Sequence, residues 1–175
     1  MSEQNDRSYE PITTPDLRGL TEIARADRED FFARKPRYAA LSNRMLCVTL
    51  CQGAALHCVD GCNGVKDFDV WTFYAAHSSA TFPWRRRIAR DFGYPKFGQS
   101  ADYPHCTGRH VDLLGRSVHV LPETDPVSFL RWYLSKPKTQ SARQLAQKAV
   151  VLLEPLDRIG FVVWPNTSTT RNLSN

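Results

Sequence analysis

Apolar residues recur at helical spacing in four segments of the chain. The clearest stripe predicts a helix that Thr14 caps and Pro36 ends. Three further stripes predict helices over 83–92, from Asp125 to Lys136, and over 139–153. The first stripe is formed by Leu17, Leu20, Ile23, Ala24 and Phe31. In the second, Trp84, Ile88 and Phe92 face inward, and Arg85, Arg86, Arg87 and Arg90 cover the rest.

Shorter runs rich in β-branched and aromatic residues predict strands. The first covers 45–52 and the second covers 66–74. Residues 109–121 predict a hairpin that turns at Gly115 and Arg116, and 158–164 predict a last strand or packed segment. The fold class is therefore α+β: a small mixed β-sheet flanked by helices, with an N-terminal helix and C-terminal helices.

The segment between the first two strands predicts a tight strand–helix–turn unit. Gly53 and Ala54 break the apolar run and open a short helix over 54–60. Gly61 suits the residue after that helix, where a positive φ is favoured. Asn63-Gly64 then signals a turn before the second strand.

Two carboxylates interrupt the second strand. Asp is disfavoured in strands, and Asp67 and Asp69 are two residues apart, so their side chains leave the same face. Oxygen ligands of this kind suit Mg²⁺, whereas the structural alternative is an exposed strand edge. Asp112 repeats the anomaly on a later strand, where it either completes a metal site or pairs with Arg109 or Arg116.

This order of residues resembles the polymerase-beta-like nucleotidyltransferase superfamily. The family signature is an apolar strand, then Gly-Gly or Gly-Ser opening a helix, then Asp-apolar-Asp on a second strand, with a third carboxylate on a later strand. The resemblance covers about residues 44–121. Ala54 stands where Gly or Ser is usual and removes a hydroxyl, so backbone N–H groups at the helix start would have to hold the phosphates.

The resemblance implies a Mg²⁺- or Mn²⁺-dependent nucleotidyltransferase that moves NMP from an NTP to an acceptor hydroxyl. The acceptor would be an RNA end, a protein side chain or a small molecule. Lys66 is expected to point away from the two acids. The implied catalytic and metal-binding residues are Asp67, Asp69 and Asp112, and the implied nucleotide-binding residues are Gly53, Ala54, Arg86 and Arg90.

Two other functions remain open. The fold would also serve as a catalytically inactive module that binds nucleotide, RNA or a protein partner. A metal-dependent nuclease would use similar acids but would not need the helix start at Gly53. The Arg-rich segment 83–92 either grips a phosphate backbone or is a solvated helix face.

Length and composition limit the classes of protein that fit. The 175 residues predict one domain over 13–165, with a core at 44–121 and a helical part at 125–154. A flexible start is expected at 1–12 and a disordered tail at 166–175. A net charge of +5 permits a nucleotide or nucleic-acid partner. No apolar run reaches the roughly 20 residues of a membrane span, so a cytoplasmic protein with reduced cysteines and no membrane partner is expected.

The long segment 93–108 is rich in Gly, Pro, Ser and Tyr and predicts a loop. Its aromatic residues Tyr94, Phe97 and Tyr103 either stack a base or hold the loop against the core.

Overall fold

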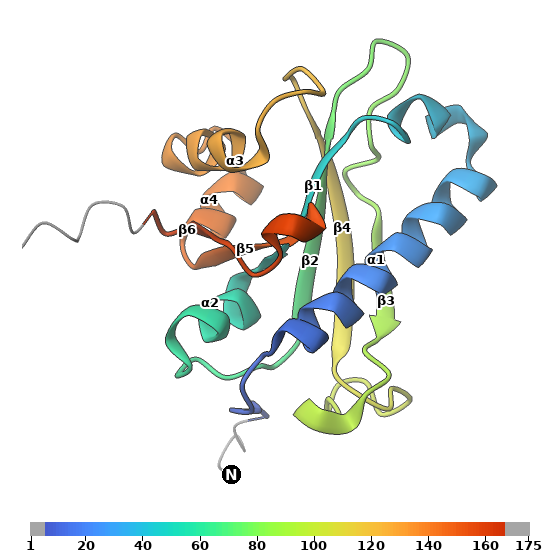
Figure 1. Cartoon of the computed structure of the whole chain (residues 1–175). Coiled ribbons are helices and arrows are strands. Elements are labelled where there is room, and N and C mark those ends of the chain that lie inside the picture. Colours follow the sequence, from blue (N-terminus) through green and yellow to red (C-terminus); the bar gives the residue numbers. More distant parts are fainter. Residues whose placement is uncertain (1–5, 167–175) are drawn as a thin grey trace, which may run out of the picture.

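The computed structural model describes residues 6–166 (Figure 1). Residues 1–5 of the predicted flexible start, and residues 167–175 of the predicted tail, lie outside this range. The helices in chain order are α1 (Thr14–Arg34), η1 (Pro36–Leu41), α2 (Gln52–Asp60), η2 (Pro95–Phe97), α3 (Pro126–Ser135), α4 (Gln140–Ala146) and η3 (Leu156–Arg158). The strands are β1 (Met45–Cys51), β2 (Phe68–Ala75), β3 (Arg87–Asp91), β4 (His110–Val118), β5 (Ala149–Glu154) and β6 (Val162–Trp164).

The strands form one six-stranded sheet in the order β3-β4-β2-β1-β5-β6. β2 and β4 run parallel, and every other neighbouring pair is antiparallel. The predicted mixed sheet with flanking helices is therefore confirmed at the level of the α+β class.

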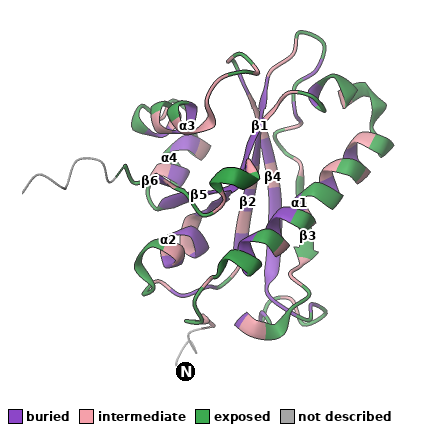
Figure 2. Cartoon of the chain, viewed as in Figure 1, coloured by how far each residue is buried: buried purple, intermediate pink, exposed green. Residues whose placement is uncertain are grey.

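Helices cover the two faces of the sheet unequally. On one face α1 crosses the strands (Figure 1) and packs Leu17, Leu20 and Ala24 onto alternate residues such as Val70 and Leu113. On the other face α3 and α4 pack onto β1, β2 and β5 through a second buried cluster. Burial follows this arrangement: the strands are buried in the middle of the sheet, and β3 at its edge is largely exposed (Figure 2).

The predicted N-terminal helix is confirmed, with its start shifted by one residue. Asp16 accepts a hydrogen bond of 2.7 Å from the Thr13 backbone amide, which places the cap at Thr13 rather than Thr14. The helix ends at Arg34, before Pro36. The first strand is confirmed as Met45–Cys51, and the positive φ of Gly61 is confirmed as well. The short helix is present but begins at Gln52, two residues before its predicted start at Ala54.

The predicted helix over 83–92 is wrong, because this segment contains strand β3. It pairs antiparallel with β4, so that Arg87 lies opposite Leu114 and Asp91 opposite His110. A spacing of four residues is even, and it therefore fits the two-residue period of a strand as well as a helical turn. Ile88 and Phe92 do pack toward the core, but from a strand.

The predicted hairpin over 109–121 is also wrong, because β4 runs unbroken through Gly115. A Cβ atom at Gly115 would lie 2.4 Å from Cε1 of Phe82. Glycine inside a strand often marks a close approach by another group, and the Gly115-Arg116 pair has the same local pattern as a two-residue turn.

The predicted helix over 139–153 is correct only in its first half. α4 ends at Ala146, and residues 149–154 form β5, which is buried along its whole length. A fully buried strand is apolar on both faces, and periodicity does not distinguish it from a buried helix. Of the predicted last strand, only Val162–Trp164 is a strand.

Candidate active site

Asp69 and Asp112 are register partners on the parallel strands β2 and β4. Their side chains leave the face of the sheet opposite to α1, since Val70 and Leu113 point toward α1. Burial, together with the negative charges of Asp67 and Asp112, raises the pKa of Asp69 to about 7. The sheet register therefore brings two of the predicted acids together, and the charge of the third, Asp67, acts on Asp69.

Asp67 and Asp69 line one open hollow of about 400 Å³. Asp67 lies one residue before β2, and both acids are partly buried. The other lining residues are Arg7, Gln52, Gly53, Lys66, Gln144, Gln147 and Lys148. The hollow thus combines two carboxylates with three basic side chains, which is a suitable environment for a polyphosphate bound with a divalent cation.

The start of α2 forms one wall of the hollow. A Cβ atom built at Gly53 would lie 3.7 Å from Nη1 of Arg7 and 3.9 Å from Nζ of Lys148. Among the described residues no side chain caps this helix start. Uncapped N–H groups at a helix start attract anions, and the two nearby cations add to that attraction.

Gln52 connects β1 to α2 with a backbone φ of +59°. A positive φ is uncommon for a residue other than glycine, and such conformations are concentrated at ligand-binding and catalytic sites. Because Gln52 also lines the hollow, the strained turn holds a polar side chain at the site.

Ala54 and Lys66 differ from their predicted positions. The Ala54 side chain is buried in the core under α1, so only its backbone belongs to the helix start. Lys66 lines the hollow instead of pointing away from the acids, since residues 66 and 67 precede β2 and do not follow strand alternation. Its amine also lies 3.5 Å from the carboxylate of Asp102.

Asp112 is held by two positively charged or hydrogen-bonding groups. Arg87 forms an ion pair with it, and Nε2 of His110 donates to its Oδ1 at 2.8 Å. Burial alone would raise the pKa of Asp112, but the hydrogen bonds from Arg87 and His110 outweigh burial and lower it. The Asp112 side chain is 3% exposed and that of Arg87 is 60% exposed, so Arg87 covers the carboxylate from the solvent side.

The alternative prediction that Asp112 pairs with Arg109 or Arg116 is wrong, because its ion-pair partner is Arg87. Arg109 pairs instead with Asp6 at 2.9 Å and donates to the carbonyl of Phe97. Arg116 makes no ion pair within residues 6–166.

The three acids do not form a ready three-ligand metal site. Across residues 6–166, no group of three His, Cys, Asp or Glu side chains is arranged to hold a metal ion. Asp67 and Asp69 share the hollow, whereas Asp112 lies beside them with its oxygens already engaged.

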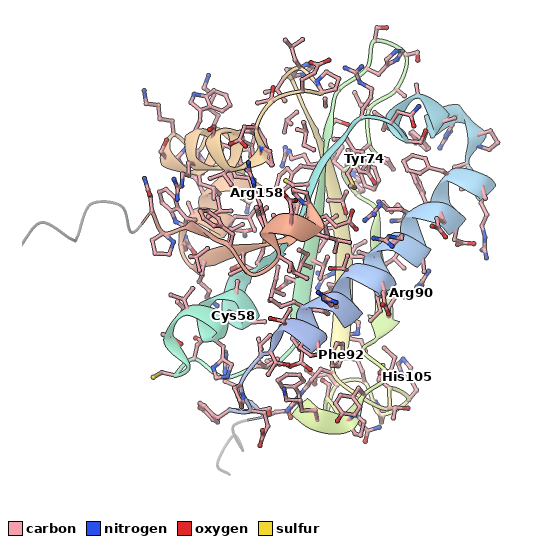
Figure 3. The ribbon with its side chains drawn as sticks, in the orientation of Figure 1. Cys58, Tyr74, Arg90, Phe92, His105 and Arg158 are labelled. Atoms are coloured by element: carbon pink, nitrogen blue, oxygen red, sulfur yellow. The ribbon has the colours of Figure 1, made fainter. Side chains whose placement is uncertain are left out.

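Arg86 and Arg90, predicted to bind nucleotide, lie on the opposite face of the sheet. Both guanidinium groups contact the buried carboxylate of Asp27 on α1, at 2.9 Å from Arg86 and 3.0 Å from Arg90. Figure 3 shows Arg90 on the side of β3 that faces α1. These arginines attach the edge strand to α1 and do not reach the hollow.

Several residues of the site were missed by sequence reasoning. Arg7 comes from the segment predicted to be flexible, where Ser8 instead pairs with Val65 beside the hollow. Lys148 comes from the segment wrongly predicted as helix. Neither position carries a local pattern, because only the folded chain brings them next to Gly53.

The loop over 93–108 is packed against the sheet through two of its aromatic residues. Phe97 is buried against Phe68 and Phe92. The Tyr103 ring stacks on His110, with centroids 3.6 Å apart, whereas Tyr94 is exposed. The loop therefore encloses the imidazole that contacts Asp112.

Comparison with known proteins gives no relative. No family model, no curated protein and no solved structure matches the chain. Among the described residues, no helix is long and apolar enough to cross a membrane. The function must therefore be argued from the geometry of the hollow.

Proposed function

We propose that this chain is a nucleotidyltransferase that binds a nucleoside triphosphate with Mg²⁺ and transfers NMP to an acceptor hydroxyl. The observation that carries the proposal is the hollow in which Asp67 and Asp69 lie with the uncapped start of α2. The strand connectivity also supports it. Antiparallel β1 and β2 are joined by α2, and β4 lies parallel to β2 with Asp112 opposite Asp69.

The terminal phosphates are assigned to the basic side of the hollow. Arg7 and Lys148 lie within 4 Å of the Cβ position of Gly53, where a side chain would block approach to the helix start. Glycine lets the backbone of α2 come close to a phosphate oxygen, while the guanidinium and ammonium groups neutralise its charge. Arg7, Gly53 and Lys148 would therefore bind and orient the triphosphate.

The acids fit a divalent cation. Mg²⁺ is usually held by one or two carboxylates together with substrate phosphates and water, and Asp67 and Asp69 supply two carboxylates. The raised pKa of Asp69 reflects burial and negative charge that the nearby cations only partly balance. When bound, the cation would polarise a phosphoryl oxygen and stabilise the charge that develops on the leaving pyrophosphate.

Asp112 is assigned to the side where the acceptor approaches. The Arg87 side chain is 60% exposed, so it can swing into solvent, whereas the Asp112 carboxylate beneath it is buried. Movement of Arg87 would uncover the Asp112 carboxylate beside Asp69, while His110 would keep it in place. In this arrangement Asp112 would orient the acceptor hydroxyl and accept its proton, and the oxygen released by Arg87 would be free to contact the cation that activates this hydroxyl.

A second candidate is a catalytically inactive module that binds nucleotide, RNA or a protein partner without transfer. The ion pair between Arg87 and Asp112 favours it, because the arginine takes the position in which a third acid would act. The two candidates differ in one property: both bind Mg²⁺–NTP, but only the enzyme transfers the nucleotide.

The proposal is tested with a thermal melt and a transfer assay on the full chain. An NTP should raise the melting temperature in the presence of Mg²⁺ but not with EDTA, and α-labelled NTP should transfer its label to an acceptor. Asp69→Asn should abolish both effects, whereas Asp157→Asn, an exposed acid on η3, should retain both. Mg²⁺-dependent protection without transfer for any acceptor class would select the binding module. Absence of both would overturn the proposal.

A further inference from the structure

A second open hollow of about 400 Å³ lies at the other end of β4. It is lined by Thr81, Phe82, Trp84, Arg116, Ser117 and His119. Trp84 is 70% exposed, which is unusual for the largest side chain, since tryptophan is highly buried on average. An indole held open beside a hollow provides a flat surface on which another ring can stack.

Positively charged side chains surround this tryptophan. The guanidinium of Arg85 lies over one face of the Trp84 ring, 4.7 Å from its centroid, so a base would stack on the opposite face. Arg116 and His119 make no hydrogen bond or ion pair through their side chains within the described part of the chain, and the described lining contains no carboxylate. The hollow therefore attracts an anionic ligand that also carries a ring.

The second hollow meets the sheet face of the acids through Arg116, whereas Phe82 and Ser117 line it from the α1 side of the sheet. Asp112, Leu114 and Arg116 alternate along β4, so their side chains share the face opposite to α1. Four residues of strand span about 13 Å between Asp112 and Arg116. Arg87, which is register partner of Leu114, lies between them. Basic residues thus connect the Trp84 hollow to the candidate active site.

We propose that the Trp84 hollow binds one nucleotide unit of a single-stranded nucleic acid. The base stacks on Trp84, and Arg116 and Arg85 bind the flanking phosphates. Aromatic platforms combined with a basic surface bind single strands with little sequence preference. A duplex does not fit this arrangement, because its bases are stacked on one another and are not free to lie on an indole ring.

This inference rests on the proposed function in one respect: it names the acceptor as the end of a nucleic-acid strand that reaches Asp112. Binding of the strand itself needs neither NTP nor Mg²⁺. The two proposals therefore have separate readouts.

The test measures the affinity of the full chain for fluorescent 12-mers of oligo-U and oligo-dT by anisotropy at low salt. Trp84→Ala and Arg116→Ala should each weaken binding about tenfold, that is by about 1.4 kcal/mol, since each removes one stacking or phosphate contact. Trp132→Ala removes an exposed tryptophan on α3, 54% exposed, and should change the affinity less than twofold. Binding of either oligonucleotide with this dependence supports the inference.

The inference would be overturned by no oligonucleotide binding, by a duplex that binds as tightly as the single strand, or by a Trp84→Ala variant that binds like the wild type. Displacement of the oligonucleotide by polyglutamate at equal charge would overturn it as well, because an acidic protein segment would then be the better ligand. Trp84→Ala should retain Mg²⁺-dependent protection by NTP. If the wild-type chain is stabilised by NTP with Mg²⁺ but binds no oligonucleotide, this inference is refuted and the proposed function is not.

Discussion

Asp69 on β2 and Asp112 on β4 lie opposite each other, yet their environments shift their pKa values in opposite directions. Burial and neighbouring acids raise the pKa of Asp69, whereas Arg87 and His110 lower that of Asp112 against the effect of burial. Pairs of acids separated in this way commonly divide the roles of proton donor and proton acceptor in active sites. The sheet register thus places side by side two carboxylates whose pKa values are shifted in opposite directions. Acids clustered on an exposed surface would not be shifted in opposite directions in this way.

The raised pKa of Asp69 predicts a pH-dependent effect of Asp69→Asn on stability in EDTA. The pKa of Asp69 is about 7 in the folded chain, and that of an unfolded Asp is about 3.9. Between these values the folded state holds a proton that the unfolded state has lost, so the contribution of Asp69 to stability falls as pH rises through 7. Asn does not titrate, so the free energy of unfolding of the variant does not carry this loss. As the pH rises across this range, the difference in free energy of unfolding, variant minus wild type, should increase by up to about 1.4 kcal/mol per pH unit.

Urea unfolding at pH 5, 6, 7 and 8 measures this difference. The free energy of unfolding of Asp69→Asn, relative to wild type, should increase over the series and level off above pH 7. The exposed control Asp157→Asn should follow the wild type at each pH. A difference that stays constant from pH 5 to pH 8 would contradict the assigned environment of Asp69.

The basic wall of the hollow predicts that Lys148→Ala weakens NTP binding more than NMP binding. Lys148 lies beside the start of α2, where the β- and γ-phosphates are assigned, so a ligand without those phosphates loses less. Loss of a charge-assisted contact of about 1.5–3 kcal/mol corresponds to roughly ten- to hundredfold weaker NTP binding. Isothermal titration with Mg²⁺ and a non-hydrolysable NTP measures it, and Lys138→Ala is the matched control. Equal loss for NTP and NMP would place the phosphates elsewhere.

The central part of the site was accessible from sequence because it depends on local spacing. The apolar run before Gly53, the turn at Gly61 and the pair Asp67 and Asp69 each follow a pattern of a few residues. The first strand and the positive φ of Gly61 formed as predicted, whereas Asp67 precedes β2 instead of lying in it. Asp112 lies opposite Asp69 in the sheet register, and its role in the site stays a prediction.

The partners of these residues depend on the tertiary structure and were not predictable in the same way. Arg87 was assigned to a helix surface, but strand pairing with β4 turns it toward Asp112 and turns Arg86 and Arg90 toward Asp27. Adjacent residues of a strand point to opposite faces, so one wrong assignment of secondary structure exchanged the arginine that contacts Asp112 with the arginines that contact Asp27.

The cover formed by Arg87 over Asp112 predicts that Arg87→Ala increases the affinity for Mg²⁺ in the presence of NTP. The guanidinium competes for the same carboxylate oxygens, and its removal leaves them free for a cation. Because the Asp112 carboxylate is buried and would keep only His110 as a partner, the free energy of unfolding at pH 7 should fall by about 1–3 kcal/mol. Mg²⁺ titrations of the thermal melt with a non-hydrolysable NTP measure the affinity. Arg85→Ala serves as the control, and an unchanged or lower Mg²⁺ affinity in Arg87→Ala would show that Asp112 takes no part in cation binding.

The unbroken course of β4 predicts opposite effects for two glycine substitutions. Gly115→Ala should lower the free energy of unfolding by about 1–3 kcal/mol, because its Cβ would lie 2.4 Å from the buried Phe82 ring. Gly19→Ala in α1 should raise it by up to about 1 kcal/mol, because helix propensity improves and the nearest atom outside the helix, on Phe92, is 3.6 Å away. Urea unfolding measures both. Phe82→Leu tests the contact, because a leucine at position 82 is smaller and more flexible than phenylalanine and makes room for the added methyl group. In the continuous strand, the double variant Gly115→Ala with Phe82→Leu should therefore be destabilised by less than the sum of the two single changes.

If Gly115 lay in a hairpin turn instead, its substitution would not meet Phe82, and the effects of the two single changes would simply add.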